Sequence, residues 1–267
     1  MKGNDAQERV FADDELSAER AYRVIDLAVA ALEDLESSGA LTRSSACSAR
    51  VFPLAFGWFT ATVRHAQLVA LAHRNGLRHE SSATSRVVMQ HALALQWLIE
   101  GGDAAVDAVE ADGRRRVASL YKELDDTGWP KPAGLIDPAL SPPPKSGALE
   151  QQLVNFKDMC TLYMGGNQLY VPYRLQSGNA HPSYAGAAAY LNQATGQVSA
   201  TAVTDTYGYL LDSARCLIQA LKTFAPLVAG SILADVANEV DAAFGVEIEL
   251  WTRIAAMPAA ARVPPGS

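Results

Sequence analysis

Apolar residues recur every three or four positions over long stretches of this chain, and this spacing is typical of amphipathic helices that pack on a shared core. Alanine is abundant as well, and its small loss of side-chain entropy in a helix favours helix over strand. The sequence therefore predicts an all-α protein, a multi-helix bundle. The clearest stretch runs from about residue 14 to residue 37, and its apolar set is Tyr22, Ile25, Val29, Leu32 and Leu35.

Capping residues and glycines indicate where the next three helices begin and end. We predict a second helix over residues 50–74, ended by an Asn-Gly pair, and a third from near residue 82 that stops at Gly101-Gly102. Asp103 is a good N-cap for a fourth helix that ends near Gly128.

Six prolines within residues 128–147 rule out a continuous helix or a central strand there, because proline lacks a backbone N–H and fixes φ. We predict a surface loop between N-terminal helices (14–127) and C-terminal helices (148–256). Both sets are expected to pack as one domain, residues 1–257, followed by a flexible tail over residues 258–267.

Short helices are predicted directly after the loop. One helix should begin at about residue 149 and end at Gly165-Gly166, and Asn167 should cap the next. That piece is expected to break at Ser177-Gly178-Asn179. His181-Pro182-Ser183 would then open a new helix, with the proline in the first turn.

Two longer amphipathic segments are predicted near the C-terminal end, over residues 204–229 and 231–256. They suit an antiparallel helix pair. Residues 195–203 show only a brief alternation of side-chain types and are predicted to be a loop.

Charge and hydropathy exclude several classes of protein. The net charge of −7 disfavours broad DNA binding, which needs many lysine and arginine contacts to phosphate. The longest apolar run, over residues 51–63, is too short to span the roughly 30 Å hydrocarbon layer of a membrane. Charged residues among the first ten predict that no export signal is present, so a cytoplasmic location is expected.

The three cysteines are widely spaced and odd in number, which indicates reduced structural thiols rather than a disulfide framework or a zinc site. The chain carries no phosphate loop, dinucleotide fingerprint, nucleophile elbow or zinc helix, so we predict no cofactor and no metal. Histidine is the remaining candidate for proton transfer near neutral pH. The five histidines are His65, His73, His79, His91 and His181.

One segment combines an arginine and a histidine with other polar residues. In residues 170–183, Arg174 is followed by Ser177 and then by His181-Pro182. This arrangement resembles the arginine-to-histidine motif of the HEPN superfamily of helical proteins. It is similar above all to an uncharacterised bacterial branch with an Arg, Ser, His-Pro pattern in a late helix. In that branch an earlier helix carries an arginine, and Arg86 occupies that place here, with Gln90 where glutamate is usual.

The resemblance implies metal-independent endoribonuclease activity at a homodimer interface, with RNA as the partner molecule and a role in stress or phage defence. Arg174 would stabilise phosphate charge, and His181 would act on the 2′-hydroxyl or on the leaving oxygen. Nearby polar groups that could complete the binding site are Tyr173, Ser177 and Asn179.

Two other arginine–histidine pairs have a similar spacing. Arg74 and His79 lie on either side of an Asn-Gly turn, and Arg86 and His91 lie on one predicted helix. Because His91 shares the apolar stripe of that helix, we predict a structural role for it.

The alternative to an enzyme is a catalytically silent helical module that dimerises or binds a partner. Active members often have a polar residue after the motif arginine, and the apolar Leu175 at this position favours the silent alternative.

Overall fold

The computed structural model describes residues 12–254, apart from residues 40, 133, 135–136, 138–141, 143–146, 204–205 and 231. It confirms an all-α multi-helix bundle. The predicted tail at 258–267 and much of the proline-rich segment lie outside the described residues. Among the described residues, no helix has both the length and the apolar composition needed to cross a bilayer.

The first two helices begin and end where the sequence predicts. Helix α2 (Glu15–Ser38) begins after Asp14, whose carboxylate accepts a hydrogen bond from the Ser17 amide at 2.8 Å. It ends at Gly39, whose φ of 64° is the left-handed conformation that glycine adopts at helix ends. Helix α3 (Val51–Arg74) follows.

Helix α4 (Ser82–Thr127) contains both the third and the fourth predicted helices. The two halves meet at Gly102, where φ is 57° and ψ is −144°, a conformation that only glycine adopts readily. The predicted stop is therefore a kink within one long element. The Asp103 carboxylate accepts a hydrogen bond from the Ser48 hydroxyl in the connection between α2 and α3.

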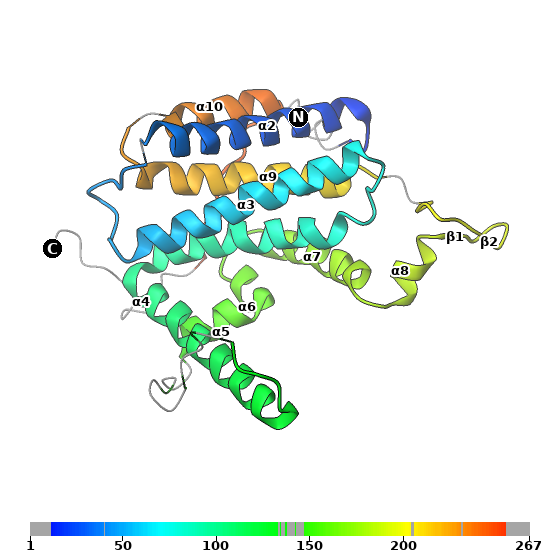
Figure 1. Ribbon diagram of the computed structural model, residues 1–267. Coiled ribbons are helices and arrows are strands. Elements are labelled where there is room, and N and C mark those ends of the chain that lie inside the picture. The colour runs from blue at the N-terminus through cyan, green and yellow to red at the C-terminus, as the bar shows by residue number, and fades with distance from the viewer. Residues whose placement is uncertain are drawn as a thin grey trace.

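The elements after the proline-rich segment are shorter. Helix α9 packs against α2, α3 and α4, and α10 lies beside α2, while α8 and the small hairpin project from one end of the body (Figure 1). In chain order these elements are α5 (Ala148–Val154), α6 (Phe156–Cys160), α7 (Gly166–Ala180), α8 (Tyr184–Ala188), β1 (Leu191–Asn192), β2 (Gln197–Val198), α9 (Gly208–Phe224), the 3₁₀ turn η1 (Ala225–Leu227) and α10 (Ile232–Phe244).

A cluster of aromatic rings fills the core at the C-terminal end of α9. Phe224 is fully buried, and its ring lies 4.6 Å from the ring of Phe59 and 6.0 Å from the ring of Phe52, both on α3. Burial of a phenylalanine side chain contributes roughly 1.5–3 kcal/mol. The helices on both sides of the proline-rich segment therefore share this apolar core.

The predicted break at Ser177-Gly178-Asn179 is wrong, because α7 is continuous from Gly166 to Ala180. The polar side chains have partners that leave the helical backbone bonds undisturbed. The Ser177 hydroxyl donates to the Tyr173 carbonyl at 2.7 Å, and the Asn179 amide donates to the Tyr209 hydroxyl at 3.1 Å.

The caps of α7 and α8 also differ from the prediction. Gly165, not Asn167, is the N-cap of α7. Pro182 lies before the first turn of α8, since Ser183 is the N-cap and its hydroxyl accepts from the Gly186 amide at 3.0 Å. Because His181 has extended backbone angles, the chain turns between the two helices at that residue.

Two further corrections concern short elements. The predicted helix after residue 149 is divided at Asn155, whose side chain caps α6 by accepting from the Lys157 amide at 3.2 Å. The predicted loop at 195–203 contains strand β2, which pairs antiparallel with β1 through Leu191 and Val198.

The last predicted helix ends twelve residues early, at Phe244 rather than at residue 256. Gly245 has a φ of 92°, and the following chain runs in extended form back to the α6–α7 connection. There the Ile254 amide donates to the Leu162 carbonyl at 2.8 Å. Helix α10 packs mainly on α2, so its contact with α9, the predicted partner, is the smaller of the two.

Candidate functional site

A cleft of about 570 Å³ lies between the start of α4, the end of α7 and α8. This volume is within the range of small-molecule and cofactor sites. One wall comes from the α3–α4 connection and α4, and the other from the end of α7, α8 and the residue before β1. The lining residues are His79, Glu80, Ser82, Ala83, Asn179, Ala180, His181, Pro182, Ser183, Gly186, Ala187 and Tyr190.

A tight connection places the first wall. Helix α3 ends at Arg74, and Gly76 takes a φ of 73°, which allows the chain to turn back at once. The Leu77 amide then donates to the Ala72 carbonyl at 2.8 Å. His79 and Glu80 follow within this turn, directly before α4, so they lie at the edge of the cleft.

Close packing at its first residue fixes the position of α7. A side-chain carbon on Gly166 would collide with the Cys160 carbonyl oxygen, so only glycine lets α7 approach the end of α6 this closely. From this anchor the helix runs to Ala180 and brings Asn179 and His181 to the second wall.

Polar contacts hold the side chains of the cleft. The Tyr190 hydroxyl donates to the Glu80 carboxylate, and this hydrogen bond raises the pKa of Tyr190 above its usual value. The His79 ring lies edge-on to the Tyr190 ring, with centroids 5.8 Å apart and an interplanar angle of 88°. His79 is only 8% exposed, whereas His181 is exposed. Two imidazoles therefore line one cleft.

The structure brings together only some of the predicted site residues. His181 and Asn179 line the cleft, but Arg174, Tyr173 and Ser177 are not among its lining residues. Arg174 is exposed on the continuous helix, so seven residues place it about 10 Å from His181 along the axis. The catalytic role of the Arg174 and His181 pair stays a prediction.

Tyr173 and Ser177 belong to a neighbouring contact with Arg86 on α4. The Arg86 guanidinium donates to the Ser177 hydroxyl at 3.3 Å and lies 5.4 Å from the centre of the Tyr173 ring. These contacts tie α7 to α4 one turn beyond the cleft residue Ser82.

A partly buried polar seam continues from this contact to α9. The Gln176 amide donates to the Asp212 carboxylate at 3.3 Å, and Arg215 lies 3.6 Å from the same carboxylate. Burial raises the pKa of Asp212, and the nearby Arg215 opposes this effect. Sequence reasoning missed the seam, although an Asp and an Arg three residues apart within an apolar helix could have indicated it.

No family model, curated protein or solved structure matches this chain.

His91 has the surroundings of a structural residue. It is half-buried, its Nδ1 lies 2.9 Å from the Val87 carbonyl oxygen of its own helix, and its ring stacks on His65 at 5.7 Å. Burial lowers the pKa of His91, with the Val87 hydrogen bond opposing and His65 adding to the decrease. The structural role of His91 stays a prediction.

The cysteines are free and buried in the packed core. Burial raises the pKa of both Cys160 and Cys216 to about 12, so these thiols stay protonated at neutral pH. Within the described part of the chain, no group of three or more His, Cys, Asp or Glu side chains could hold a metal ion.

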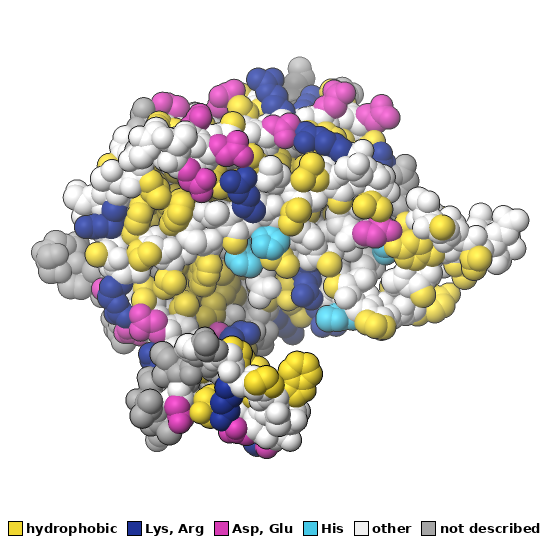
Figure 2. Space-filling view, viewed as in Figure 1, with side chains coloured by type: hydrophobic (Ala, Val, Ile, Leu, Met, Phe, Trp, Pro, Cys, Tyr) yellow, Lys and Arg dark blue, Asp and Glu magenta, His cyan; other side chains and the backbone are white. Residues whose placement is uncertain are grey.

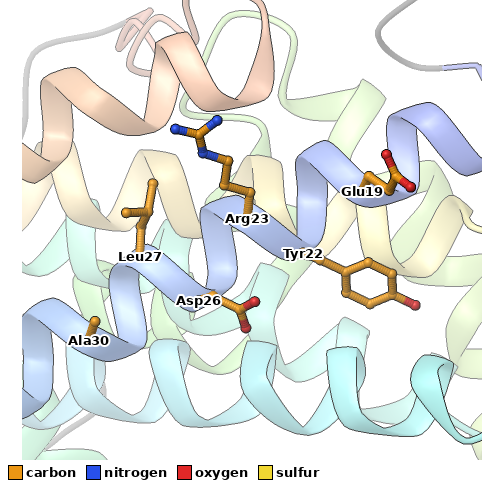
Figure 3. Close-up of a pocket in the computed structure, with 6 residues that line it drawn as sticks. All are labelled: Glu19, Tyr22, Arg23, Asp26, Leu27 and Ala30. Carbon is orange, nitrogen blue, oxygen red and sulfur yellow. The ribbon is translucent and has the colours of Figure 1, made fainter.

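A second hollow of about 440 Å³ runs along the outer face of α2, where Glu19, Arg23 and Asp26 project from the helix (Figure 3). Asp26 forms an ion pair with Arg74 at 2.7 Å, and the same guanidinium lies 4.6 Å from the centre of the Tyr22 ring. Acidic and basic side chains alternate along this edge of the molecule, while the face over α3 and α4 shows more hydrophobic side chains (Figure 2). These features favour a solvated ion-pair surface.

Proposed function

We propose that this chain is a HEPN-like endoribonuclease that cleaves RNA without a metal ion, with His181 as an acid–base residue. The observation that carries the proposal is the cleft, where the exposed His181 imidazole lies beside Asn179 on one wall and His79 and Glu80 lie on the other. An imidazole can accept or donate a proton near neutral pH. The Asn179 amide donates one N–H to the Tyr209 hydroxyl, and its second N–H can bind a ribose or phosphate oxygen.

The proposed step is a transesterification within the RNA. The ribose 2′-oxygen forms a bond to the adjacent phosphorus while the bond from phosphorus to the 5′-oxygen breaks. A base removes the 2′-hydroxyl proton, and an acid protonates the departing 5′-oxygen. The products are a 2′,3′-cyclic phosphate and a 5′-hydroxyl, so no water and no oxidant is consumed.

The negative charge of the RNA phosphate has to be balanced by an imidazolium or by a positive group from outside the cleft, because none of the described lining residues is lysine or arginine. We propose that a homodimer supplies Arg174. Val171 and Leu175 flank it on the outer side of α7 and are 58% and 70% exposed. A two-fold interface over these residues would bring both copies of Arg174 together.

The same surface supports a second candidate function, a silent module that binds a partner through α7. Exposed apolar residues one helical turn apart are typical of a helix face that is covered by another protein. The exposure of Leu175 directly after Arg174 favours this candidate. Under it, the cleft would bind no RNA and the Arg174 face would still dimerise or bind a partner.

RNA cleavage by the purified protein in excess chelator separates the two candidates. We expect His181→Ala and Arg174→Ala each to lower the cleavage rate by about 100-fold or more, the size of a lost acid–base or charge-stabilising group. His91→Gln is the matched histidine control and should cleave at the wild-type rate. Cleavage abolished by chelator, or unaffected by both alanine variants, would exclude the proposed mechanism.

We also propose a role in stress or phage defence, which can be tested in cells. Expression of the wild-type chain should arrest growth by degrading RNA, and expression of His181→Ala at the same level should not. Equal arrest by both chains would show that toxicity does not arise from the cleft.

A further inference from the structure

We infer that His79 is a second acid–base residue of this cleft, acting with His181 on the same substrate. The inference rests on the proposed RNA cleavage. It starts from the position of His79 on the α4 side of the cleft, while His181 lies on the α7 side. The two residues are 102 positions apart in the chain, and the fold alone brings them to one cavity.

The turn that carries His79 is held on both sides. Before it, the Arg78 guanidinium donates to the Tyr207 hydroxyl at 2.8 Å and lies 4.0 Å from the centre of that ring. After it, the Ser82 amide donates to the His79 carbonyl at 3.1 Å. The position of the His79 ring is restricted by the ring of Tyr190, whose hydroxyl donates a hydrogen bond to the Glu80 carboxylate. A proton-transfer group needs this kind of fixed position.

The other three histidines lie in different surroundings. His65 and His91 place Nδ1 within 2.6 and 2.9 Å of a carbonyl oxygen of their own helices and stack on each other. His73 is 3% exposed and faces the Tyr207 ring at 6.3 Å. Among the described residues that line the cleft, the histidines are His79 and His181.

The chemistry of the cleft gives a second histidine two tasks. One imidazole takes the 2′-hydroxyl proton while the other, protonated, gives its proton to the 5′-oxygen, and exchange with water restores both. The protonated ring also supplies a positive charge next to the phosphate, which the described lining residues otherwise lack. A single histidine would have to perform both proton transfers in turn.

A leaving-group test separates an acid–base role from a structural one. The substrates are an oligoribonucleotide and uridine 3′-(4-nitrophenyl phosphate), whose nitrophenolate departs without being protonated. On RNA we expect His79→Gln and His181→Gln each to cleave about 100-fold more slowly or worse. On the nitrophenyl ester, the variant that lacks the acid should recover to near the wild-type rate, and the variant that lacks the base should not.

Controls distinguish loss of chemistry from loss of the cleft. His79→Gln should still bind a non-cleavable 2′-deoxy oligonucleotide, no more than about tenfold more weakly than wild type because one positive charge is lost, and His91→Gln should match wild type on both substrates. Wild-type cleavage by His79→Gln, loss of its oligonucleotide binding, or equal loss on both substrates in both glutamine variants would overturn the role of His79 while RNA cleavage itself stands. A wild-type protein that cleaves neither substrate would overturn the proposed function and this inference together.

Discussion

The two ends of α9 lie in contrasting surroundings. At its C-terminal end, Phe224 is fully buried among the aromatic rings of α3. At its N-terminal end, Tyr209 and Asp212 take part in hydrogen bonds with α7, close to the cleft. Apolar burial stabilises a fold without regard to direction, whereas hydrogen bonds fix positions. The aromatic end therefore supplies stability, and the polar end orients α7.

The largest effect should come from the aromatic end. Phe224→Ala removes a ring that contacts Phe59 and Phe52 and leaves a cavity that rigid helices cannot close. We expect the free energy of unfolding to fall by about 3–5 kcal/mol, measured by urea denaturation. A loss below about 1 kcal/mol would show that this end is loosely packed and would remove the contrast between the two ends.

The anchor of α7 should give the next largest effect. Gly166→Ala places a carbon against the Cys160 carbonyl oxygen, so α7 has to move, at a cost of about 1–3 kcal/mol. Gly178→Ala is the matched control on the same helix, since its new carbon meets no atom within 4 Å. It should stabilise the helix by roughly 0.5–1 kcal/mol. If urea denaturation gave the same change in the free energy of unfolding for both substitutions, it would contradict the close approach of α7 to α6.

A smaller, pH-dependent effect is expected at His91. Burial lowers its pKa, so the unfolded chain binds this proton more readily than the folded one, and His91 destabilises the fold as pH drops below about 6.5. His91→Leu should remain folded and lose less stability than wild type between about pH 7 and about pH 5. Thermal melting at both pH values tests this. A variant with the same pH dependence as wild type would show that His91 does not titrate as described.

The smallest effect on stability is expected on the outer side of α7. Leu175 is 70% exposed, so Leu175→Gln should change the free energy of unfolding by less than about 0.5 kcal/mol. If α7 forms the homodimer interface, the same substitution should shift the sedimentation of the protein toward the monomer. A dimer that is unaffected would place the interface elsewhere.

The sequence predicts those parts of the fold that depend on local patterns. The apolar period of α2 and the glycine pair that interrupts α4 are local signals, and the structure shows the helix at the first and a kink at the second. The continuity of α7 was not predictable, because the hydrogen bond from Asn179 goes to Tyr209 in a helix 30 residues away. The early end of α10 has a similar cause, since the extended chain after it pairs with the α6–α7 connection.

Only half of the candidate site could be predicted from the sequence. His181 and Asn179 were identified from one segment, and both line the cleft. Glu80 was not identified, and His79 was named only as one of five histidines and in the pair with Arg74, because residues about 100 positions apart give no shared local pattern. The Arg174 prediction depended on a helix break that α7 does not have.

Side-chain NMR of the histidines tests the location of the site most directly. The protein is labelled at histidine, each signal is assigned by a histidine-to-glutamine variant, and a non-cleavable 2′-deoxy or 2′-fluoro oligonucleotide is added. If RNA binds in this cleft, the signals of His79 and His181 shift together until the protein is saturated with oligonucleotide, while those of His65 and His91 stay in place. Shifts at His65 and His91 alone, or no shift at any histidine, would contradict an RNA site in this cleft.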